Sequence, residues 1–236
     1  MQIKECIILA GGLGTRLRSE VPDLPKCLAP VAGKPFLHWV IRHLQSQHVE
    51  RFILSVGYMH EKIEAFIADA YPLLPVTFSL ETTPLGTGGA IKLALLQCSG
   101  NDVMAVNGDT LFETDNDRLM YYHDENKAAC TLALKPVKDS YRFGSVEIDA
   151  QGNIVAFSEK KFIQSGLING GVYLLDRQCF EQADLPVAFS FEKDYLETYI
   201  GAQKMIGVQD DGYFIDIGIP ADLKKAHEEI NKKYND

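Results

Sequence analysis

The sequence lacks any hydrophobic run long enough to cross a membrane and any arrangement of cysteines typical of a metal site. A membrane-spanning helix needs about 20 consecutive apolar residues, and no stretch approaches that length. The five cysteines are scattered (Cys6, Cys27, Cys98, Cys130 and Cys179), so we interpret them as reduced thiols. Met1–Glu5 lead directly into an apolar stretch without a secretory signal, and we therefore expect a cytoplasmic protein with no membrane partner.

Positive charge is also scarce. Lys and Arg number 23 against 32 Asp and Glu, which gives a formal net charge of −9. Because nucleic-acid-binding domains usually carry a basic face, we expect no nucleic-acid partner. The six histidines show no mutual spacing for a metal or catalytic cluster, and we interpret them as structural or solvated (His38, His43, His48, His60, His123 and His227).

What the sequence does contain is a regular alternation of strand and helix patterns in its first half. At 236 residues it is long enough for one sizeable domain with a real core. Strands are expected at 7–9, 52–56, 76–80 and 103–106, and helices at 35–44, 63–67 and 88–96. Such alternation predicts right-handed crossovers and a mainly parallel sheet covered on both sides. Ligands of such sheets bind at the carboxyl ends of the strands.

The second half has a different pattern. Strands are expected at 130–134, 143–148, 154–157 and 168–175, and helices at 191–203 and 220–233. The turn Asp149-Ala150-Gln151-Gly152-Asn153 predicts a hairpin between two of these strands. No linker or repeat interrupts the chain, so we predict one continuous domain over residues 1–236 whose second half is richer in antiparallel pairing.

A glycine-rich loop follows the first apolar stretch. The run Ile7-Ile8-Leu9-Ala10-Gly11-Gly12-Leu13-Gly14-Thr15-Arg16-Leu17 is followed by a polar segment that ends in Pro25-Lys26. Glycines let a ligand approach bare backbone N–H groups, which favour anions, and Arg16 and Lys26 add positive charge. The residues therefore predict a polyphosphate pocket, although strand-to-helix turns also use glycine for purely structural reasons. The dinucleotide pattern and the P-loop both fail at Gly14-Thr15-Arg16-Leu17.

This loop resembles, almost letter for letter, the N-terminal motif of the sugar-1-phosphate nucleotidyltransferases. The resemblance implies a Rossmann-like, three-layer α/β domain of the GT-A-like kind, with a mixed, mainly parallel sheet and a smaller antiparallel sugar-binding region. It implies a nucleotide-binding half over about residues 1–115 and a sugar-phosphate-binding half over about 116–236. Nucleotide-binding residues in the loop would be Leu9, Ala10, Gly11, Gly12, Gly14, Thr15, Arg16 and Lys26, with Arg16 and Lys26 also catalytic.

Two aspartates follow apolar runs. Asp109 ends Val106-Asn107-Gly108-Asp109, and Asp216 follows Tyr213-Phe214-Ile215. Carboxylates at such positions can hold Mg²⁺ together with phosphate oxygens and water, although an aspartate there can also merely cap a loop. The resemblance implies that Asp109 and Asp216 ligate Mg²⁺, that Asp109 is catalytic, and that Asn107 and Gly108 bind the nucleotide.

The segment Glu81-Thr82-Thr83-Pro84-Leu85-Gly86-Thr87-Gly88-Gly89-Ala90 is a second glycine-rich turn. It would serve equally as a plain strand-to-helix connection. It resembles the family's base-recognition loop, which implies that Glu81, Pro84, Gly86 and Thr87 bind the nucleotide. Backbone groups at Gly86 and Thr87 would read the edge of the nucleobase, and Glu81 would lie near the sugar-phosphate end of the pocket.

Further matches fall in the second half. The resemblance implies contacts to the sugar phosphate from Gly144, Glu159, Lys160, Asn169, Gly170 and Lys193. Taken singly, Lys160 is a typical solvated lysine and Asn169 a typical turn residue.

The implied reaction is Mg²⁺-dependent attack of a sugar 1-phosphate on the α-phosphorus of a nucleoside triphosphate, with release of pyrophosphate. Within the family, the segments Arg18–Lys26, Gly33–Leu37, Ser55–Tyr58 and Ser190–Asp194 are most similar to heptose 1-phosphate guanylyltransferases, which implies GTP as donor. Mannose-1-phosphate guanylyl transfer, uridylyl or thymidylyl transfer to another hexose 1-phosphate, and a non-catalytic regulatory subunit are the alternatives. A homo-oligomer is compatible with the sequence.

Overall fold

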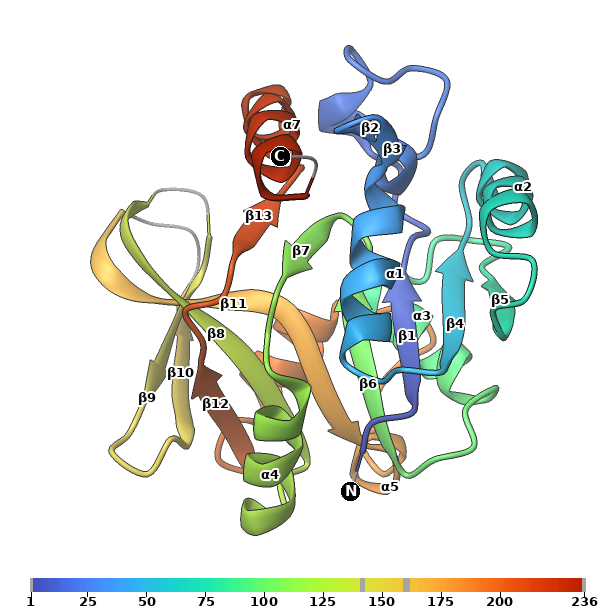
Figure 1. Cartoon of the computed structure of the whole chain (residues 1–236). Helices are drawn as coiled ribbons and strands as arrows, with labels where there is room; N and C mark the ends of the chain where they lie inside the picture. Colours follow the sequence, from blue (N-terminus) through green and yellow to red (C-terminus); the bar gives the residue numbers. More distant parts are fainter. Residues whose placement is uncertain (1, 141–142, 159–161, 235–236) are drawn as a thin grey trace.

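The computed structural model describes residues 2–140, 143–158 and 162–234 (Figure 1). Its strands are β1 (Glu5–Leu9), β2 (Pro30–Val31), β3 (Lys34–Pro35), β4 (Arg51–Val56), β5 (Val76–Leu80), β6 (Asp102–Asn107), β7 (Thr110–Phe112), β8 (Cys130–Ser140), β9 (Ser145–Ile148), β10 (Ile154–Ser158), β11 (Ile163–Asp176), β12 (Met205–Gln209) and β13 (Phe214–Asp216). Its helices are α1 (Phe36–Ser46), α2 (His60–Ala70), α3 (Gly86–Leu95), α4 (Asn116–Asn126), α5 (Arg177–Glu181), α6 (Glu197–Tyr199) and α7 (Pro220–Tyr234). Short 3₁₀ turns, η1 (Thr15–Leu17) and η2 (Lys26–Leu28), and one π-helix, η3 (Phe191–Leu196), complete the described elements.

The central sheet is mixed. Its strand order is β10–β9–β11–β6–β1–β4–β5, with β8 paired to β11 and β12 paired to β8. The first-half strands β1, β4, β5 and β6 are parallel, whereas β11 runs antiparallel to β6, β8 and β9. Leu9 lies opposite both Ser55 and Asn107, so β1, β4 and β6 end at the same edge, at the top of Figure 1.

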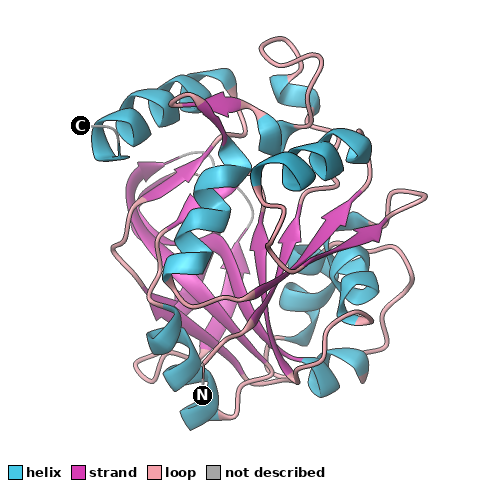
Figure 2. Ribbon diagram, turned by 45° about the vertical axis from the view of Figure 1, so that its right-hand side comes forward, coloured by secondary structure: helices cyan, strands magenta, loops and turns pink. Residues whose placement is uncertain are grey.

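Helices cover both faces of this sheet (Figure 2). Successive residues of a strand point to opposite faces. Accordingly, Cys6 and Ile8 of β1 belong to the core beneath α1, while Ile7 packs in a second core with Ile91 of α3. The predicted three-layer α/β architecture with an antiparallel second half is therefore confirmed.

Most of the predicted helices and strands are present, and one predicted helix has a different type of helical structure. The apolar spacing of Phe36, Val40 and Leu44 gives α1 as expected, and all three side chains are buried. The single helix expected over 191–203 is instead the π-helix η3 followed by the short α6. At the start of η3, Phe191 and Glu192 are hydrogen-bonded to Thr87 of α3. The periodicity of apolar residues, which predicted one regular helix, does not take such tertiary contacts into account.

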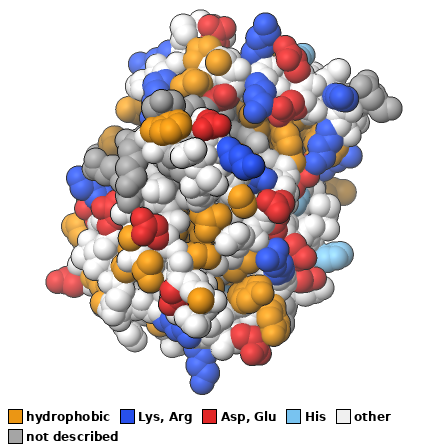
Figure 3. All heavy atoms as spheres, turned by 90° about the vertical axis from the view of Figure 1, so that its left-hand side faces the viewer, with side chains coloured by type: hydrophobic (Ala, Val, Ile, Leu, Met, Phe, Trp, Pro, Cys, Tyr) orange, Lys and Arg blue, Asp and Glu red, His pale blue; other side chains and the backbone are white. Residues whose placement is uncertain are grey.

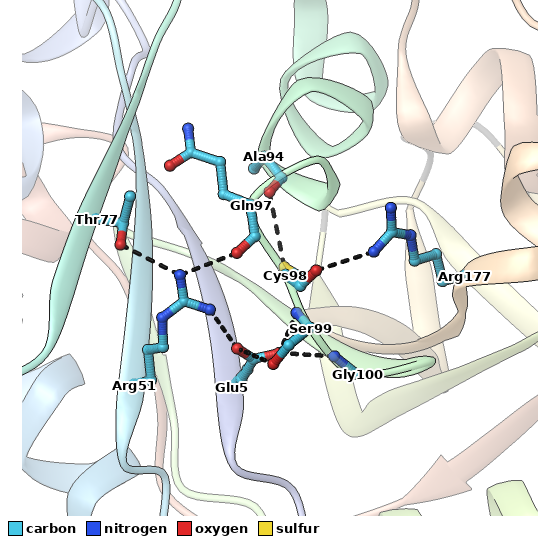
Figure 4. A network of polar contacts seen from close by, with 9 residues as sticks. All are labelled: Glu5, Arg51, Thr77, Ala94, Gln97, Cys98, Ser99, Gly100 and Arg177. Atoms are coloured by element: carbon cyan, nitrogen blue, oxygen red, sulfur yellow. Dashed lines mark hydrogen bonds and ion pairs between the residues drawn. The ribbon is translucent and has the colours of Figure 1, made fainter.

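A buried carboxylate secures the amino-terminal edge of the sheet, away from the glycine loop (Figure 4). Glu5 of β1 accepts hydrogen bonds from the backbone N–H groups of Ser99 and Gly100 at 2.8 and 2.9 Å and is ion-paired with Arg51 of β4. Burial alone would raise the pKa of the Glu5 carboxyl. The hydrogen bonds and the ion pair outweigh burial and lower this pKa to about 2.

The surface carries charged side chains of both signs, as the amino-acid composition predicts. On the face shown in Figure 3, acidic and basic side chains are interspersed with small apolar groups. Within the described residues, no helix combines the length and the apolar character that a membrane span requires.

Candidate functional site

A cavity of about 600 Å³ opens at the carboxyl ends of β1, β4, β5 and β6. Residues that follow these strands converge there because the parallel strands end at one edge. The lining comprises Leu9, Ala10, Gly11, Gly12, Leu13, Lys26, Cys27, Ser55, Gly57, Tyr58, Glu81, Thr82, Thr83, Pro84, Gly86, Thr87, Ala90, Asn107 and Asp109. Most residues predicted to bind a nucleotide are therefore brought together in one cavity.

Four predicted nucleotide-binding residues lie outside the lining: Gly14, Thr15, Arg16 and Gly108. Thr15 and Arg16 are exposed in the 3₁₀ turn η1, and Gly14 precedes that turn. Gly108 donates its backbone N–H to the carbonyl of Leu9 at 2.9 Å, which joins the ends of β1 and β6. Arg16 is thus an exposed residue that follows the glycine loop and is not part of the cavity lining.

The backbone of Gly11 and the side chain of Glu81 lie close together. A Cβ on Gly11 would lie 2.6 Å from Oε1 of Glu81. The Glu81 carboxylate also accepts the backbone N–H of Leu85 at 3.0 Å and lies 3.4 Å from the Ser55 hydroxyl. Glu81 therefore stands fixed against the bare backbone of the glycine loop, inside the cavity lining.

Lys26 and Asp109 form an ion pair in the lining. Lys26 begins η2, on the far side of the polar segment after the glycine loop, and Asp109 links β6 to β7. The side chains retain 18% and 33% of their exposure, so both charges remain accessible to a ligand that enters the cavity. The neighbouring Cys27 is unsuited to act as a nucleophile, because burial and the charge of Asp109 raise the pKa of its thiol to about 12.

Asp216, from the distant end of the chain, comes close to the Thr110 hydroxyl beside Asp109, although Asp216 is not among the residues that line the cavity. Strands β7 and β13 pair antiparallel and set Asp216 opposite Thr110. The Thr110 hydroxyl lies 3.3 Å from a carboxylate oxygen of Asp109 and 3.5 Å from one of Asp216. The backbone N–H of Gly218 donates to Asp216 at 2.6 Å and fixes that carboxylate. One hydroxyl thus brings together the two predicted metal ligands.

Two carboxylates suit a hard cation whose other ligands come from outside the protein. Mg²⁺ is usually held by one or two carboxylates, with substrate phosphates and water filling the rest of its octahedron. Among the described residues, no group of three or more His, Cys, Asp and Glu side chains could hold a metal ion. The donor set of Asp109 and Asp216 therefore fits a metal that binds together with a phosphate substrate.

Tyr58 was not among the residues predicted to bind a ligand, although the segment Ser55–Tyr58 is one of those that resemble heptose 1-phosphate guanylyltransferases. Tyr58 lines the cavity, and its ring lies 5.2 Å from the Arg18 guanidinium carbon. Lys62 of α2 donates to the backbone carbonyl of Asp23. These contacts hold the polar segment 18–25 against α2. The position of Tyr58 just beyond a strand adjacent to β1 was the signal that could have identified it.

The start of α3 is engaged by a segment from the second half. Phe189 donates its N–H to the Leu85 carbonyl at 2.8 Å and accepts from Gly88 at 3.0 Å. Gly86 has a positive φ of 71°, and a Cβ there would lie 2.4 Å from the Phe189 carbonyl oxygen. Thr87 faces the cavity, but its hydroxyl bonds to Glu192 at 2.7 Å. Gly86 and Thr87 are therefore close to the cavity and also tied to residues 189–192.

The predicted sugar-phosphate residues lie outside the cavity lining or outside the described residues. Gly144 immediately precedes β9, Asn169 and Gly170 are in β11, and Lys193 is exposed in η3. Glu159 and Lys160 lie outside the described residues. Gly170 packs so closely on Phe112 of β7 that a Cβ would lie 2.3 Å from its ring. Gly170 of β11 thus packs against β7, the strand that follows Asp109.

Comparison with known proteins gives consistent matches over the whole chain. Residues 5–233 match the family model described as Nucleotidyl transferase. The D-glycero-alpha-D-manno-heptose 1-phosphate guanylyltransferase of Aneurinibacillus thermoaerophilus is 46% identical over 226 residues, which cover 96% of this chain and 98% of the relative. The protein of the same name from Campylobacter jejuni is 42% identical over 218 residues, 92% of this chain and 96% of the relative.

The structure is also similar to solved structures of nucleotide-transferring enzymes. The crystal structure of HddC from Yersinia pseudotuberculosis complexed with GMP-PN matches with a TM-score of 0.86 and 36% identity, covering 97% of this chain and 100% of that chain. An inositol-1-phosphate CTP transferase from T. maritima, at 19% identity and a TM-score of 0.81 over 98% of each chain, shares the fold.

Proposed function

Because this chain belongs to the nucleotidyl transferase family, we propose that it transfers the guanylyl group of GTP to D-glycero-α-D-manno-heptose 1-phosphate, giving GDP-heptose and pyrophosphate. The observation that carries the proposal is the cavity where the glycine loop, Lys26 and Asp109 meet. The names and high coverage of the Aneurinibacillus and Campylobacter relatives support guanosine and heptose as the substrate parts.

In this proposal the acceptor needs no protein base. A phosphate monoester has a second pKa of about 6, so it is largely a dianion at neutral pH. The reaction instead needs in-line positioning of acceptor and donor and neutralisation of crowded negative charge. Lys26 leaves its ion pair with Asp109 and binds the α-phosphate, and Arg16 binds the leaving phosphates from the exposed turn. Residues of about 1–115 hold the nucleotide, and residues of about 116–236, including Glu159 and Lys160, hold the sugar phosphate.

Enzymes of this family typically use a divalent metal ion, and we propose Mg²⁺ for this chain. Asp109 and Asp216 would hold it, and when bound it would supply positive charge next to the triphosphate. The Thr110 hydroxyl lies between the two carboxylates and can donate its single proton to either one of them.

Guanine recognition is assigned in this proposal to Glu81. Guanine presents neighbouring N1–H and N2–H donors on one edge, whereas uracil and thymine present a single N–H between carbonyls. A carboxylate carries two acceptor oxygens and matches the guanine edge better. The location of Glu81 in the cavity lining, fixed by Leu85, supports this role.

A substrate panel tests the proposal. Pyrophosphate release is measured with GTP, ATP, UTP and dTTP, each against the 1-phosphates of the heptose, mannose and glucose. We expect the highest kcat/KM for GTP with the heptose 1-phosphate. A clear preference for mannose 1-phosphate or for UTP would assign another substrate, and inactivity with every pair would favour a regulatory subunit.

A further inference from the structure

The start of α3 lies against residues from the second half of the chain. Four backbone N–H groups at the start of any helix have no partner within the helix. In α3, Leu85 donates its N–H to Oε2 of Glu81 at 3.0 Å. Gly88 donates its N–H to the carbonyl of Phe189 at 3.0 Å. The two remaining groups have no hydrogen-bond partner in the described part of the chain and belong to two residues of the cavity lining, Gly86 and Thr87.

The glycines of this turn allow the two segments to pack together. A Cβ on Gly88 would lie 2.1 Å from an atom of the Phe189 ring. A Cβ on Gly89 would lie 2.5 Å from the carbonyl oxygen of Val187. Because protein interiors are closely packed, a larger residue at either position would force the segments apart. The glycine-rich turn is therefore a packing surface for the second half of the chain as well as part of the cavity wall.

The Thr87 hydroxyl is engaged within the protein. It donates to the Glu192 carboxylate at 2.7 Å and accepts the backbone N–H of Phe191 at 2.9 Å. The Ser190 hydroxyl donates to the same carboxylate oxygen at 3.0 Å. Because a hydroxyl carries one proton and a carboxylate only accepts, the Thr87 proton is directed to Glu192. The side chain of Thr87 is therefore bound to η3, and its backbone N–H is the donor left for a ligand.

The same contacts extend to Glu81, the carboxylate proposed to bind guanine. Glu81 accepts the N–H of Leu85, and the carbonyl of Leu85 accepts the N–H of Phe189 at 2.8 Å. Residues 189–192 thus bond to Leu85 and, through Glu192 and Phe191, to Thr87. A shift of these residues would therefore reach the Glu81 carboxylate through an unbroken series of hydrogen bonds.

We propose that residues 189–192 are a positioning segment for the nucleobase. The hydrogen bond between Thr87 and Glu192 holds the start of α3 in place, and the bonds through Leu85 carry this constraint to Glu81. The presence of a guanine base at this side of the cavity rests on the proposed function. The affinity for the nucleobase is thus set in part by the second half of the chain.

Calorimetric binding tests this role without turnover. Kd values are measured with Mg²⁺ for GTP and, separately, for inorganic tripolyphosphate, which has the phosphate chain but no base. Thr87→Val removes the hydroxyl while keeping the shape of the side chain, and Glu192→Met removes the carboxylate acceptor. We expect each to raise the Kd for GTP about tenfold, as for the loss of one hydrogen bond to a charged group, and to leave the Kd for tripolyphosphate within about twofold of wild type.

Three further variants separate positioning from other effects. Thr87→Ser restores the hydroxyl and should recover most of the affinity for GTP. Glu197→Met is the matched control for Glu192→Met at an exposed position of α6, and it should bind GTP like wild type. The double variant of Thr87→Val and Glu192→Met should bind GTP no more weakly than either single one, because both changes break the same bond. A Thr87 hydroxyl that contacted the nucleotide itself would make the two effects add.

Wild-type Kd values for GTP in both Thr87→Val and Glu192→Met would overturn the positioning role. An equal loss of GTP and tripolyphosphate binding would also overturn it, because the damage would then extend beyond the base. Glu192 is half-buried, so Glu192→Met carries the test if Thr87→Val does not fold.

Failure of the proposed function gives a different result. If the wild type binds ATP or UTP more tightly than GTP, the guanine assignment is wrong, and the same variants test the positioning role with the preferred nucleotide. A wild type that binds no nucleotide more tightly than tripolyphosphate would overturn the proposed function and the positioning role together.

Discussion

Lys26 and Asp109, 83 positions apart in the sequence, form an ion pair in the lining of the cavity. This pair joins a cation predicted to bind phosphate with a carboxylate predicted to bind metal. In the proposed reaction, the triphosphate would replace Asp109 as the partner of Lys26, and the metal ion would replace Lys26 as the partner of Asp109. Without substrate, the charges of Lys26 and Asp109 neutralise each other.

The first prediction concerns Lys26. Lys26→Ala should lower kcat/KM by about 10²- to 10³-fold, because a positive charge that stabilises the transferred phosphate in the transition state is lost. The melting temperature should change little, since Asp109 keeps a third of its exposure and can be solvated. Steady-state kinetics and thermal denaturation measure both effects.

Lys4→Ala serves as the control for Lys26, because Lys4 forms an exposed ion pair with Glu50 far from the cavity. It should leave kcat/KM unchanged. Wild-type turnover in Lys26→Ala would remove Lys26 from the catalytic residues.

The second prediction concerns the metal. Asp216→Asn should raise the Mg²⁺ concentration for half-maximal activity about tenfold or more, because one of two charged oxygen ligands becomes neutral. Asp211→Asn, an exposed position in the loop between β12 and β13, is the control. Binding of Mn²⁺, measured by electron paramagnetic resonance, gives a readout without turnover. Identical metal titrations for Asp216→Asn and wild type would contradict the assignment.

The third prediction concerns the nucleobase. Glu81→Gln should lower kcat/KM for GTP about tenfold and leave that for UTP and ATP nearly unchanged, because an amide offers guanine one acceptor instead of two. Glu61→Gln, exposed on α2, is the control. A parallel fall for all nucleotides would show that Glu81 acts on the loop rather than on the base.

The fourth prediction is a pH dependence of stability. The pKa of Glu5 is about 2 in the folded protein and 4.5 when unperturbed, so folding favours its charged form. The resulting stabilisation is fully present above pH 4.5 and is lost as the pH falls toward about 2. A shift of this size corresponds to about 3 kcal/mol.

Glu5→Gln should therefore destabilise the protein at neutral pH and flatten the loss of stability between pH 4.5 and 2. Urea unfolding across this range measures both. Glu50→Gln, which affects only the exposed pair with Lys4, should behave like wild type. A Glu5→Gln variant with the wild-type pH profile would assign the acid sensitivity to other carboxylates.

The predictable part of the site depends on local sequence and one general rule. The glycine loop, Asn107 and Glu81 each follow an apolar strand, and parallel strands bring their carboxyl ends together. This rule predicts that the loops after the strands meet, and the resemblance to the nucleotidyltransferase motifs identified Asn107 and Glu81 as nucleotide-binding residues, which both line the cavity. Local sequence patterns also predicted α1 and the hairpin at Asp149, whose backbone N–H bonds to the Asn153 carbonyl at 2.9 Å.

What could not be predicted depends on tertiary packing. The helix expected at 191–203 is broken into η3 and α6, and Thr87 and Glu192 meet although they are 105 positions apart. No local pattern signals a contact of this kind. Arg16, prominent in the sequence, is exposed in η1 and is not part of the cavity lining.

The most direct test of the central claim follows the phosphorus atoms of GTP. The protein is incubated with Mg²⁺, D-glycero-α-D-manno-heptose 1-phosphate and GTP labelled at either the α- or the γ-phosphate. Guanylyl transfer in the cavity predicts α-label in GDP-heptose and γ-label in pyrophosphate, with both products formed about 10²- to 10³-fold more slowly by Lys26→Ala. Release of the γ-label as free phosphate, or no consumption of GTP at all, would contradict it.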